Sequence, residues 1–235
     1  MAEGENLYWQ EVDEAEPQYR SKSIVDMAFR IDCSHLPVDH AYALLTSLES
    51  FLPWFSTAAN TGIHAIHGAE SGNGWQRPEG HGGGVIHPSR RVRLILRIPR
   101  DRISQCAGLS GQTLIVADAE VSLGSIKVRE LGPASTLFAR RIVTSEDEKE
   151  QRFLDRIDEE LTELNVSVPK RLPGRLSKIN TPRGELLARS LMLADIPAAD
   201  SIRIQETGLG KARTLGCGLF VPHKSISAVN RFTEE

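Results

Sequence analysis

The chain has 235 residues, 40% of them hydrophobic and 25% charged, which is typical of a globular protein with apolar material for one large or two smaller cores. It contains no apolar run near the roughly 18 residues of a membrane span, and its N-terminus has no signal-peptide core. Its three cysteines, Cys33, Cys106 and Cys217, are odd in number and widely spaced, so we expect a reducing, cytoplasmic setting with neither a disulfide framework nor a zinc site.

The net charge of -3 hides a segregation of charge along the chain. Residues 3–16 hold six acidic and no basic side chains, and residues 146–163 are also acidic. Residues 90–102 hold six arginines and one aspartate, and the chain from Lys170 onward holds eleven basic and six acidic residues. Two basic zones of this kind either bind a polyanion locally or form solvated faces.

The first half of the sequence predicts the element order βαββαβ. Residues 1–21 read as an acidic, flexible tail, and residues 24–31 alternate as a strand. Pro37 opens a helix that Pro53 ends. The apolar stripe of this helix is formed by Ala41, Leu44, Leu45, Leu48, Phe51 and Leu52.

A second strand is predicted over residues 62–67, followed by a glycine-rich loop from Gly68 to Gly84. Residues 91–98 predict a third strand, with basic and apolar residues partly alternating. A short helix near residues 100–107 and one strand from Thr113 into the 120s complete the unit.

The second half predicts the same order. Residues 136–143 form a strand, and Ser145 caps the next helix with Glu148 as its capping-box partner. The buried stripe of that helix consists of Phe153, Leu154, Ile157, Leu161 and Leu164. Segments 169–180 and 185–194 predict a hairpin, 197–207 a short helix, and 219–221 the last strand.

The repeated order predicts an α+β protein of two tandem ferredoxin-like (RRM-like) domains. We place the first domain at residues 22–128 and the second at residues 129–225, with a C-terminal tail over residues 226–235.

The glycine-rich loop before the last strand is the most distinctive stretch. It contains Gly208, Gly210, Gly216 and Gly218 together with Lys211 and Arg213. Glycine lets backbone N–H groups approach an anion, and the two cations attract phosphate. The loop follows a helix and precedes a strand, which is the wrong order for a dinucleotide fingerprint, and a P-loop motif is absent.

This arrangement resembles the signature loop of the RAMP superfamily of CRISPR-associated RNA-binding proteins. More narrowly, residues 23–225 resemble the repeat-processing endoribonucleases of CRISPR systems, the sixth Cas family. The resembling stretches run from Leu36 to Leu44, Gly62 to His67, Gly72 to Trp75, Glu185 to Leu191 and Gly208 to Lys224.

The resemblance implies binding of a CRISPR repeat stem-loop and one cut at its base without a metal or other cofactor. It implies that a 2′-OH attacks the adjacent phosphate, leaving a 2′,3′-cyclic phosphate and a 5′-OH. It further implies that the protein stays on the guide RNA and joins other Cas subunits in an effector complex.

Metal-free cleavage needs a group to take the 2′-OH proton and a donor to the leaving oxygen, and histidine suits both roles. Among seven histidines, His64 stands where the family often places its catalytic histidine. His67 is the second candidate and His40 the third. A strand would turn His64 and His67 to opposite faces, because they are three residues apart.

The RNA-binding candidates are basic, glycine and aromatic residues. They are Gly208, Gly210, Lys211, Arg213, Gly216, Gly218, His223, Lys224, Arg90, Arg91, Arg93, Arg97, Arg175, Lys178 and Trp75. RNA stems are recognised mostly through shape and backbone, so these residues need not read bases. Arg171, Arg175 and Lys178, on the basic hairpin, are positioned to enter the groove of a stem, and Trp75 either stacks on a base or anchors packing.

Two other functions fit the same sequence. A non-catalytic cap on the guide RNA within an effector complex would share the fold and the loop. A generic RNA-binding protein of RRM type would carry paired aromatics on its central strands, and no such cluster occurs among the 6% aromatic residues.

Overall fold

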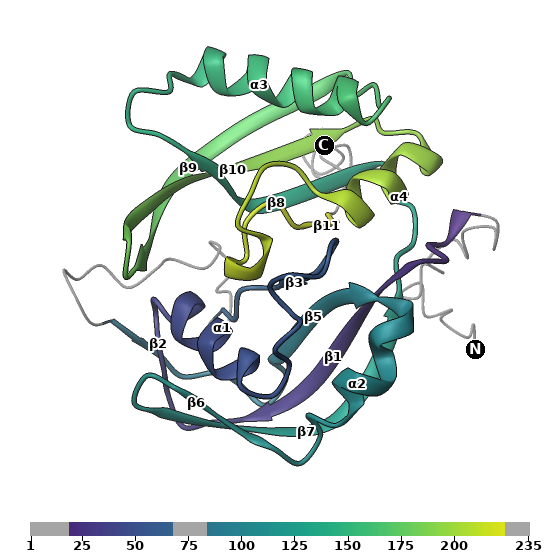
Figure 1. Cartoon of the computed structure of the whole chain (residues 1–235). Coiled ribbons are helices and arrows are strands. Elements are labelled where there is room, and N and C mark those ends of the chain that lie inside the picture. Colours follow the sequence, from purple (N-terminus) through teal and green to yellow (C-terminus); the bar gives the residue numbers. More distant parts are fainter. Residues whose placement is uncertain (1–18, 68–83, 224–235) are drawn as a thin grey trace, which may run out of the picture.

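The computed structural model describes residues 19–67 and 84–223 and shows a mixed α+β protein with antiparallel sheets (Figure 1). Trp75 and Lys224 lie outside the described residues, as do most of the predicted tails and of the loop after His67. Within the described ranges, no helix is both long and apolar enough to cross a membrane.

Within the described residues, the N-terminal half contains seven strands, two α-helices and the 3-10 turn η2. They are β1 (Ile24–Asp32), β2 (Leu36–Pro37), α1 (Ala41–Glu49), β3 (Gly62–Ile63), β4 (Val85–Ile86), β5 (Arg93–Pro99), η2 (Arg100–Arg102), α2 (Ile103–Ala107), β6 (Thr113–Val116) and β7 (Ala119–Glu130). Five of the strands form one sheet in the order β3-β5-β1-β7-β6, and β2 pairs with β4.

Alternation along the central strand β1 decides which face of this sheet is buried. Val25, Met27 and Phe29 are at most 1% exposed and pack with Leu44 and Leu48 of α1 in one apolar cluster. The residues that alternate with them, such as Asp26 and Arg30, therefore lie on the other face, which we call the outer face.

Four predictions for this half need correction. The helix begins at Ala41 and not after Pro37, because Leu36 and Pro37 pair with β4. Phe51 lies beyond the end of the helix and is 41% exposed. The strand at residues 62–67 is only Gly62–Ile63, extended by the bond from His64 N–H to the Ile95 carbonyl. The single strand after Thr113 is the hairpin of β6 and β7, which turns at Ala117, where φ is +57°.

Up to residue 223, where the described part of the chain ends, the C-terminal half contains four strands and two α-helices. They are β8 (Thr136–Thr144), α3 (Glu150–Glu163), β9 (Lys170–Thr181), β10 (Gly184–Ala194), α4 (Ala198–Thr207), the 3-10 turn η3 (Arg213–Leu215) and β11 (Phe220–Pro222). The sheet order is β11-β8-β10-β9, and all neighbours are antiparallel. Helix α3 covers one face of the sheet through Phe153, Ile157 and Leu161 (Figure 1).

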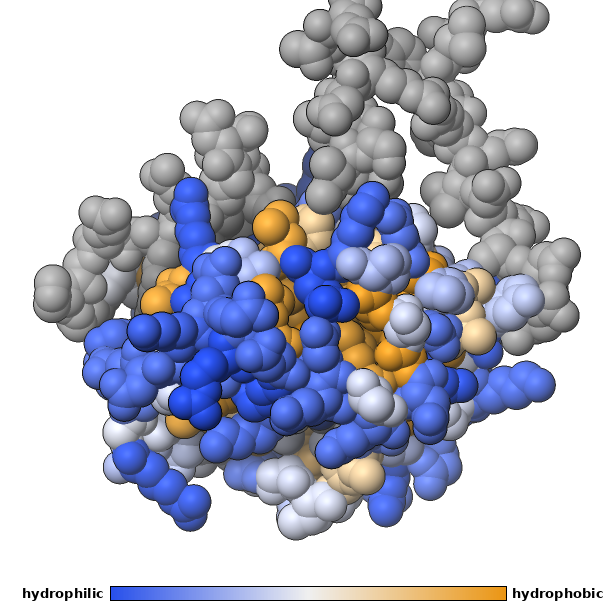
Figure 2. Space-filling view, turned by 90° about the horizontal axis from the view of Figure 1, so that it is seen from above, coloured by the Kyte–Doolittle hydropathy of each residue, from blue (hydrophilic) through white to orange (hydrophobic). Residues whose placement is uncertain are grey.

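The predicted strands, hairpin and helices of this half are present, but the cap of α3 is not. The helix begins at Glu150 after Lys149, and no side chain caps it. Glu148 accepts instead from Thr144 and Arg156, at 2.5 and 2.8 Å. The face of the molecule seen from above is mainly hydrophilic, with hydrophobic residues showing between hydrophilic ones (Figure 2).

The two halves are in direct contact. Ala41 at the start of α1 packs with Ile179, Ala188 and Cys217 of the C-terminal half. Asp39 accepts a hydrogen bond of 2.8 Å from the backbone N–H of Asn180. The segment between α4 and β11, which carries the four loop glycines, reaches from the C-terminal half to β3 (Figure 1). This interface brings together the histidine segment and the glycine loop.

Candidate active site and RNA-binding surface

The glycine loop lies directly on the predicted catalytic segment. A Cβ atom on Gly216 would stand 3.2 Å from the carbonyl oxygen of Ile63 and 3.5 Å from the backbone nitrogen of Ala65. Glycine is therefore needed at position 216 both for its φ of +83° and for this close approach. Two stretches that lie about 150 residues apart in the sequence are thus in direct contact.

His64 faces a buried ion pair. Its Nε2 lies 3.5 Å from Oδ1 of Asp26, and its side chain is 14% exposed. Burial lowers the pKa of His64, and the nearby guanidinium groups of Arg97 and Arg213 add to this, against the opposing effect of Asp26. His64 is therefore neutral near pH 7 and able to take up a proton.

His67 lies toward the second half of the molecule. Burial lowers the pKa of His67 to about 3, and the positive charges of Arg140 and Arg141 on β8 contribute. The strand that would turn His64 and His67 to opposite faces ends at Ile63, so both belong to an irregular segment. His67 is likewise neutral at physiological pH.

His40 is 3% exposed, and both of its ring nitrogens are engaged. Nδ1 lies 2.8 Å from the Pro37 carbonyl and must donate to it, so Nε2 accepts the N–H of Ile66 at 3.3 Å. Burial lowers the pKa of His40. The ring thereby links the histidine segment to the residues just before α1.

Arg97 is completely buried and does not face solvent. Its Nε and Nη2 donate to the two carboxylate oxygens of Asp26 at 2.8 and 3.0 Å. Its Nη1 donates to the carbonyls of Gln205 and Phe220 at 2.8 and 2.9 Å. We therefore remove Arg97 from the RNA-binding candidates. The sequence was misleading here because the alternation of charged and apolar residues did not reveal that the C-terminal half covers this end of β5.

Arg213 is also committed to the protein. It donates to the carbonyls of Asn60 and Thr61 in the N-terminal half, at 3.4 and 3.2 Å, and to those of Glu206 and Thr207 at the end of α4. Burial lowers the pKa of Arg213 to about 10. This arginine joins the halves, whereas the sequence suggested that it holds phosphate.

The N–H groups of the four glycines are used within the protein. Gly208 donates to Ile204, Gly216 to Arg213, and Gly218 to Arg141, all to backbone carbonyls. Gly210 donates to the carboxylate of Glu160 at 2.5 Å. The glycines shape the loop through positive φ angles of 66° to 83°, and the exposed Lys211 is its outward cation.

The outer face of the N-terminal sheet carries a row of cations that the sequence pattern only partly revealed. Arg30 stands directly opposite Arg93, and Lys127 and Arg129 stand opposite Ala28 and Asp26. Like charges directly opposite each other repel, and a bound polyanion would relieve this. We call Arg30, Arg93, Lys127 and Arg129 the basic strip. The alternation of Lys127 and Arg129 with Ile126 and Val128 was the signal available in the sequence.

The remaining candidates lie away from the interface. Arg90 and Arg91 are exposed just before β5, and His223 is exposed after β11. Arg175 and Lys178 are exposed on the edge strand β9, where Lys178 pairs with Glu185 at 2.7 Å. Arg171 of the same strand is held by Asp158 of α3 at 2.9 Å.

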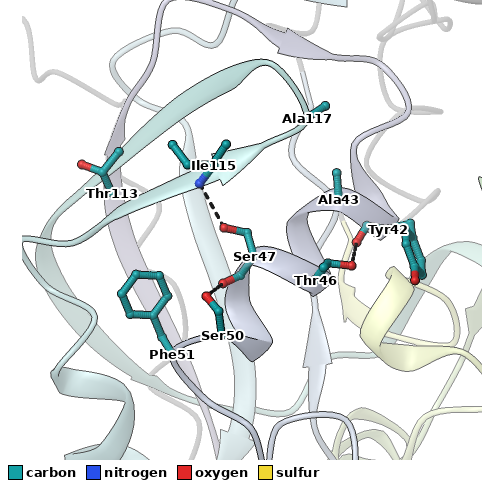
Figure 3. A pocket seen from close by; sticks show the side chains of 9 residues that line it. All are labelled: Tyr42, Ala43, Thr46, Ser47, Ser50, Phe51, Thr113, Ile115 and Ala117. Carbon is teal, nitrogen blue, oxygen red and sulfur yellow. Dashed lines mark hydrogen bonds between the residues drawn. The ribbon is translucent and has the colours of Figure 1, made fainter.

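A groove of about 590 Å³ between α1 and β6 contains none of the predicted site residues (Figure 3). Tyr42, Phe51 and Ile115 line it, and Ser47 accepts the N–H of Ile115 at 3.0 Å. Its nine lining residues carry no charge, so it does not suit a phosphate backbone. Among the residues that the structure describes, no three His, Cys, Asp or Glu side chains are grouped to hold a metal ion.

Comparisons with known proteins agree on one family. The family model described as Cas6 Crispr matches residues 25–225. A protein of Myxococcus xanthus (strain DK1622), described as CRISPR-associated endonuclease Cas6, is 27% identical over 198 residues, which are 84% of this chain and 81% of that protein.

Solved structures share the fold at low sequence identity. One described as CRISPR associated protein Cas6 has a TM-score of 0.55 at 12% identity, over 86% of this chain and 99% of that chain. Another, described as a RAMP protein binding different RNA substrates, has a TM-score of 0.52 at 16% identity, over 83% of this chain and 98% of that chain.

Proposed function

Because this chain belongs to the Cas6 family of CRISPR-associated endoribonucleases, we propose that it binds the stem-loop of a CRISPR repeat transcript and cuts it once without a metal. The observation that carries the proposal is the packing of Gly216 against the backbone of Ile63 and Ala65. This contact joins the histidine segment to the loop that carries Lys211.

We assign His64 as the general base, with His67 as the second candidate. A neutral imidazole takes the 2′-OH proton, the 2′-oxygen bonds to phosphorus, and the bond from phosphorus to the 5′-oxygen breaks. The leaving oxygen takes a proton from a general acid or water, which gives a 2′,3′-cyclic phosphate and a 5′-OH. Nearby cations stabilise the additional negative charge on the phosphorane.

RNA binding is assigned to cations at the surface. Arg90, Arg91 and the basic strip, whose Arg93 is half-buried and donates to the Arg90 and Val92 carbonyls, hold phosphates on the N-terminal half. Lys211 of the glycine loop and His223 after β11 add further contacts. Arg175 and Lys178 on β9 lie at a sheet edge, from which long side chains reach a stem. We further propose that the product stays bound and that the protein joins other Cas subunits in the cytoplasm.

The fold supports this assignment at the level of topology. In the C-terminal half the order β8-α3-β9-β10-α4-β11, with sheet order β11-β8-β10-β9, is that of a ferredoxin-like domain. In the N-terminal half β3, β5, β1 and β7 follow the same pattern, with β6 added at the edge. We propose that both halves are ferredoxin-like.

The test is cleavage of a labelled repeat stem-loop by excess protein in EDTA. We expect a single cut, a product end that polynucleotide kinase phosphorylates directly, and no cut when the 2′-OH at the site is replaced by hydrogen. His64→Ala should slow the cut by roughly 10²- to 10⁴-fold, whereas His35→Ala, at a histidine beside Asp118, should not.

Two outcomes would contradict the proposal. Full-rate cutting by both His64→Ala and His67→Ala would remove the catalytic assignment. Tight binding without any cut by the unaltered protein would favour the alternative, a non-catalytic cap on the guide RNA of an effector complex.

A further inference from the structure

Asp26 stands between the candidate base and a completely buried arginine. Its Oδ1 lies 3.5 Å from Nε2 of His64 and 2.8 Å from Nε of Arg97. The side chain of His64 is 14% exposed, that of Asp26 15% and that of Arg97 1%. The three groups lie on the outer face of the sheet, on β1, on β5 and just after β3.

Arg97 fixes the carboxylate of Asp26 in one orientation. Two parallel N–H bonds hold both of its oxygens, which is the geometry that a guanidinium prefers. The remaining Nη1 is held by carbonyls of Gln205 and Phe220 in the C-terminal half. The position of Asp26 therefore depends on the docking of the two halves.

We propose that Asp26 is a positioning residue for His64, whose orientation and tautomer its carboxylate sets. A carboxylate facing Nε2 favours the tautomer with its proton on that nitrogen and leaves Nδ1 to accept the 2′-OH proton. The imidazolium formed then carries an Nε2–H toward a fixed negative charge. This inference rests on the proposed role of His64. The separation of 3.5 Å between Nε2 of His64 and Oδ1 of Asp26 is of the kind that shortens once substrate binds.

The charges that face His64 determine the direction in which its pKa moves when the charge of Asp26 is removed. Asp26 favours the protonated ring, while Arg97 from β5 and Arg213 from the glycine loop oppose it. His67 on the same segment and, beyond it, Arg140 and Arg141 of β8 complete the surroundings. Removal of the Asp26 charge leaves the opposing cations, so the pKa of His64 must fall further.

The first experiment leaves Asp26 unsubstituted. Nitrogen-15 NMR of the full chain, with His64 assigned by its loss in His64→Gln, reports which ring nitrogen carries the proton. We expect the Nε2–H tautomer near pH 7. A ring protonated on Nδ1 would overturn the proposal, whether or not His64 proves to be catalytic.

The second experiment compares Asp26→Asn with Asp32→Asn, a matched change at an exposed aspartate of the same strand. Asp26→Asn should lower kcat roughly tenfold to hundredfold and move the acidic limb of the pH profile and the NMR titration of His64 to lower pH. Asp32→Asn should change neither. A slower enzyme with an unmoved titration would overturn the proposal, because a merely structural role predicts that result.

The experiments distinguish a failure of the proposed catalytic function of His64 from a failure of the positioning role of Asp26. If His64→Ala cuts at full rate while the tautomer and the titration behave as expected, His64 is not the base but Asp26 still positions it. If Asp26→Asn does not fold, the tautomer measured in the unaltered protein decides.

Discussion

Basic side chains serve two opposite purposes in this molecule. Arg97 and Arg213 direct their N–H groups at protein acceptors, mainly backbone carbonyls of both halves. Lys211, two residues before Arg213, is exposed. A guanidinium presents five donors in a rigid plane and so can satisfy several buried carbonyls, whereas a flexible ammonium group on the surface suits a phosphate.

We therefore expect Arg213→Ala and Lys211→Ala to act on different properties. Arg213→Ala leaves four carbonyls without their donor and should lower the free energy of unfolding by about 2 kcal/mol or more. Lys211→Ala should change it by less than about 0.5 kcal/mol but reduce the salt dependence of RNA binding. Denaturant titration measures the free energy of unfolding, and RNA binding at several salt concentrations measures the salt dependence. Equal free energies of unfolding for the two variants would contradict the role of Arg213.

The protonation of His67 should make stability depend on pH. Burial, together with Arg140 and Arg141, lowers its pKa from 6.5 to about 3, so between these values the unfolded chain binds more protons than the folded one. Stability contributed by the neutral ring is complete above about pH 6.5 and is lost as the pH falls toward 3. His67→Gln should reduce this loss between pH 7.5 and 5. An identical pH dependence of denaturation in the variant and the unaltered protein would refute the prediction.

At the scale of elements, the glycine loop is a support and not an open phosphate cradle. Its four glycines adopt left-handed backbone angles, and their N–H groups already have acceptors. The loop fastens α4 and β11 to the histidine segment through Gly216 and Arg213. A shift of the loop would therefore shift the candidate catalytic residues.

Gly218→Ala tests this element against a matched glycine. The new methyl group would overlap the Leu209 carbonyl at a φ of +66°, so we expect a loss of about 3 kcal/mol or more. Gly111 has a φ of +84° with no atom near its Cβ position, so Gly111→Ala should cost only about 1–2 kcal/mol. Thermal unfolding of both variants measures the difference, and equal losses would show that the contact with Leu209 is unimportant.

At the scale of the whole molecule, the two halves share a buried ionic and apolar interface. Arg97 links Asp26 of β1 to carbonyls of α4 and β11. Apolar contacts of Ala41 with Ile179 and Cys217 also join the two halves. A buried arginine with every partner in place strongly couples the elements that supply those partners.

We accordingly expect the two halves to unfold in one calorimetric transition. Arg97→Met leaves the Asp26 carboxylate without its buried partner and should cost about 3–5 kcal/mol, with the transition broadened or split into two. Arg91→Met, at an exposed arginine just before the same strand, is the control and should leave the transition unchanged. A single sharp transition in Arg97→Met would show that the halves are not coupled through this residue.

Much of the order of elements followed from the sequence. Alternation predicted β1, β5 and β8, and the 3.6-residue stripe predicted α1 and α3, because these patterns depend only on which side of an element is buried. The start of α1 and the cap of α3 were mispredicted because Leu36 pairs with β4 and Glu148 pairs with Arg156, contacts that no local pattern encodes.

The sequence by itself determined the family, the glycine loop and the histidines, since these depend on residue types and their spacing. Only the tertiary structure decided which cations are available, because Arg97 and Arg213 look like surface residues until both halves cover them. It also decided that both ring nitrogens of His40 are engaged, that Asp26 faces His64, and that the loop lies on the histidine segment. Such contacts join residues far apart in the chain, so they arise only when the two halves dock.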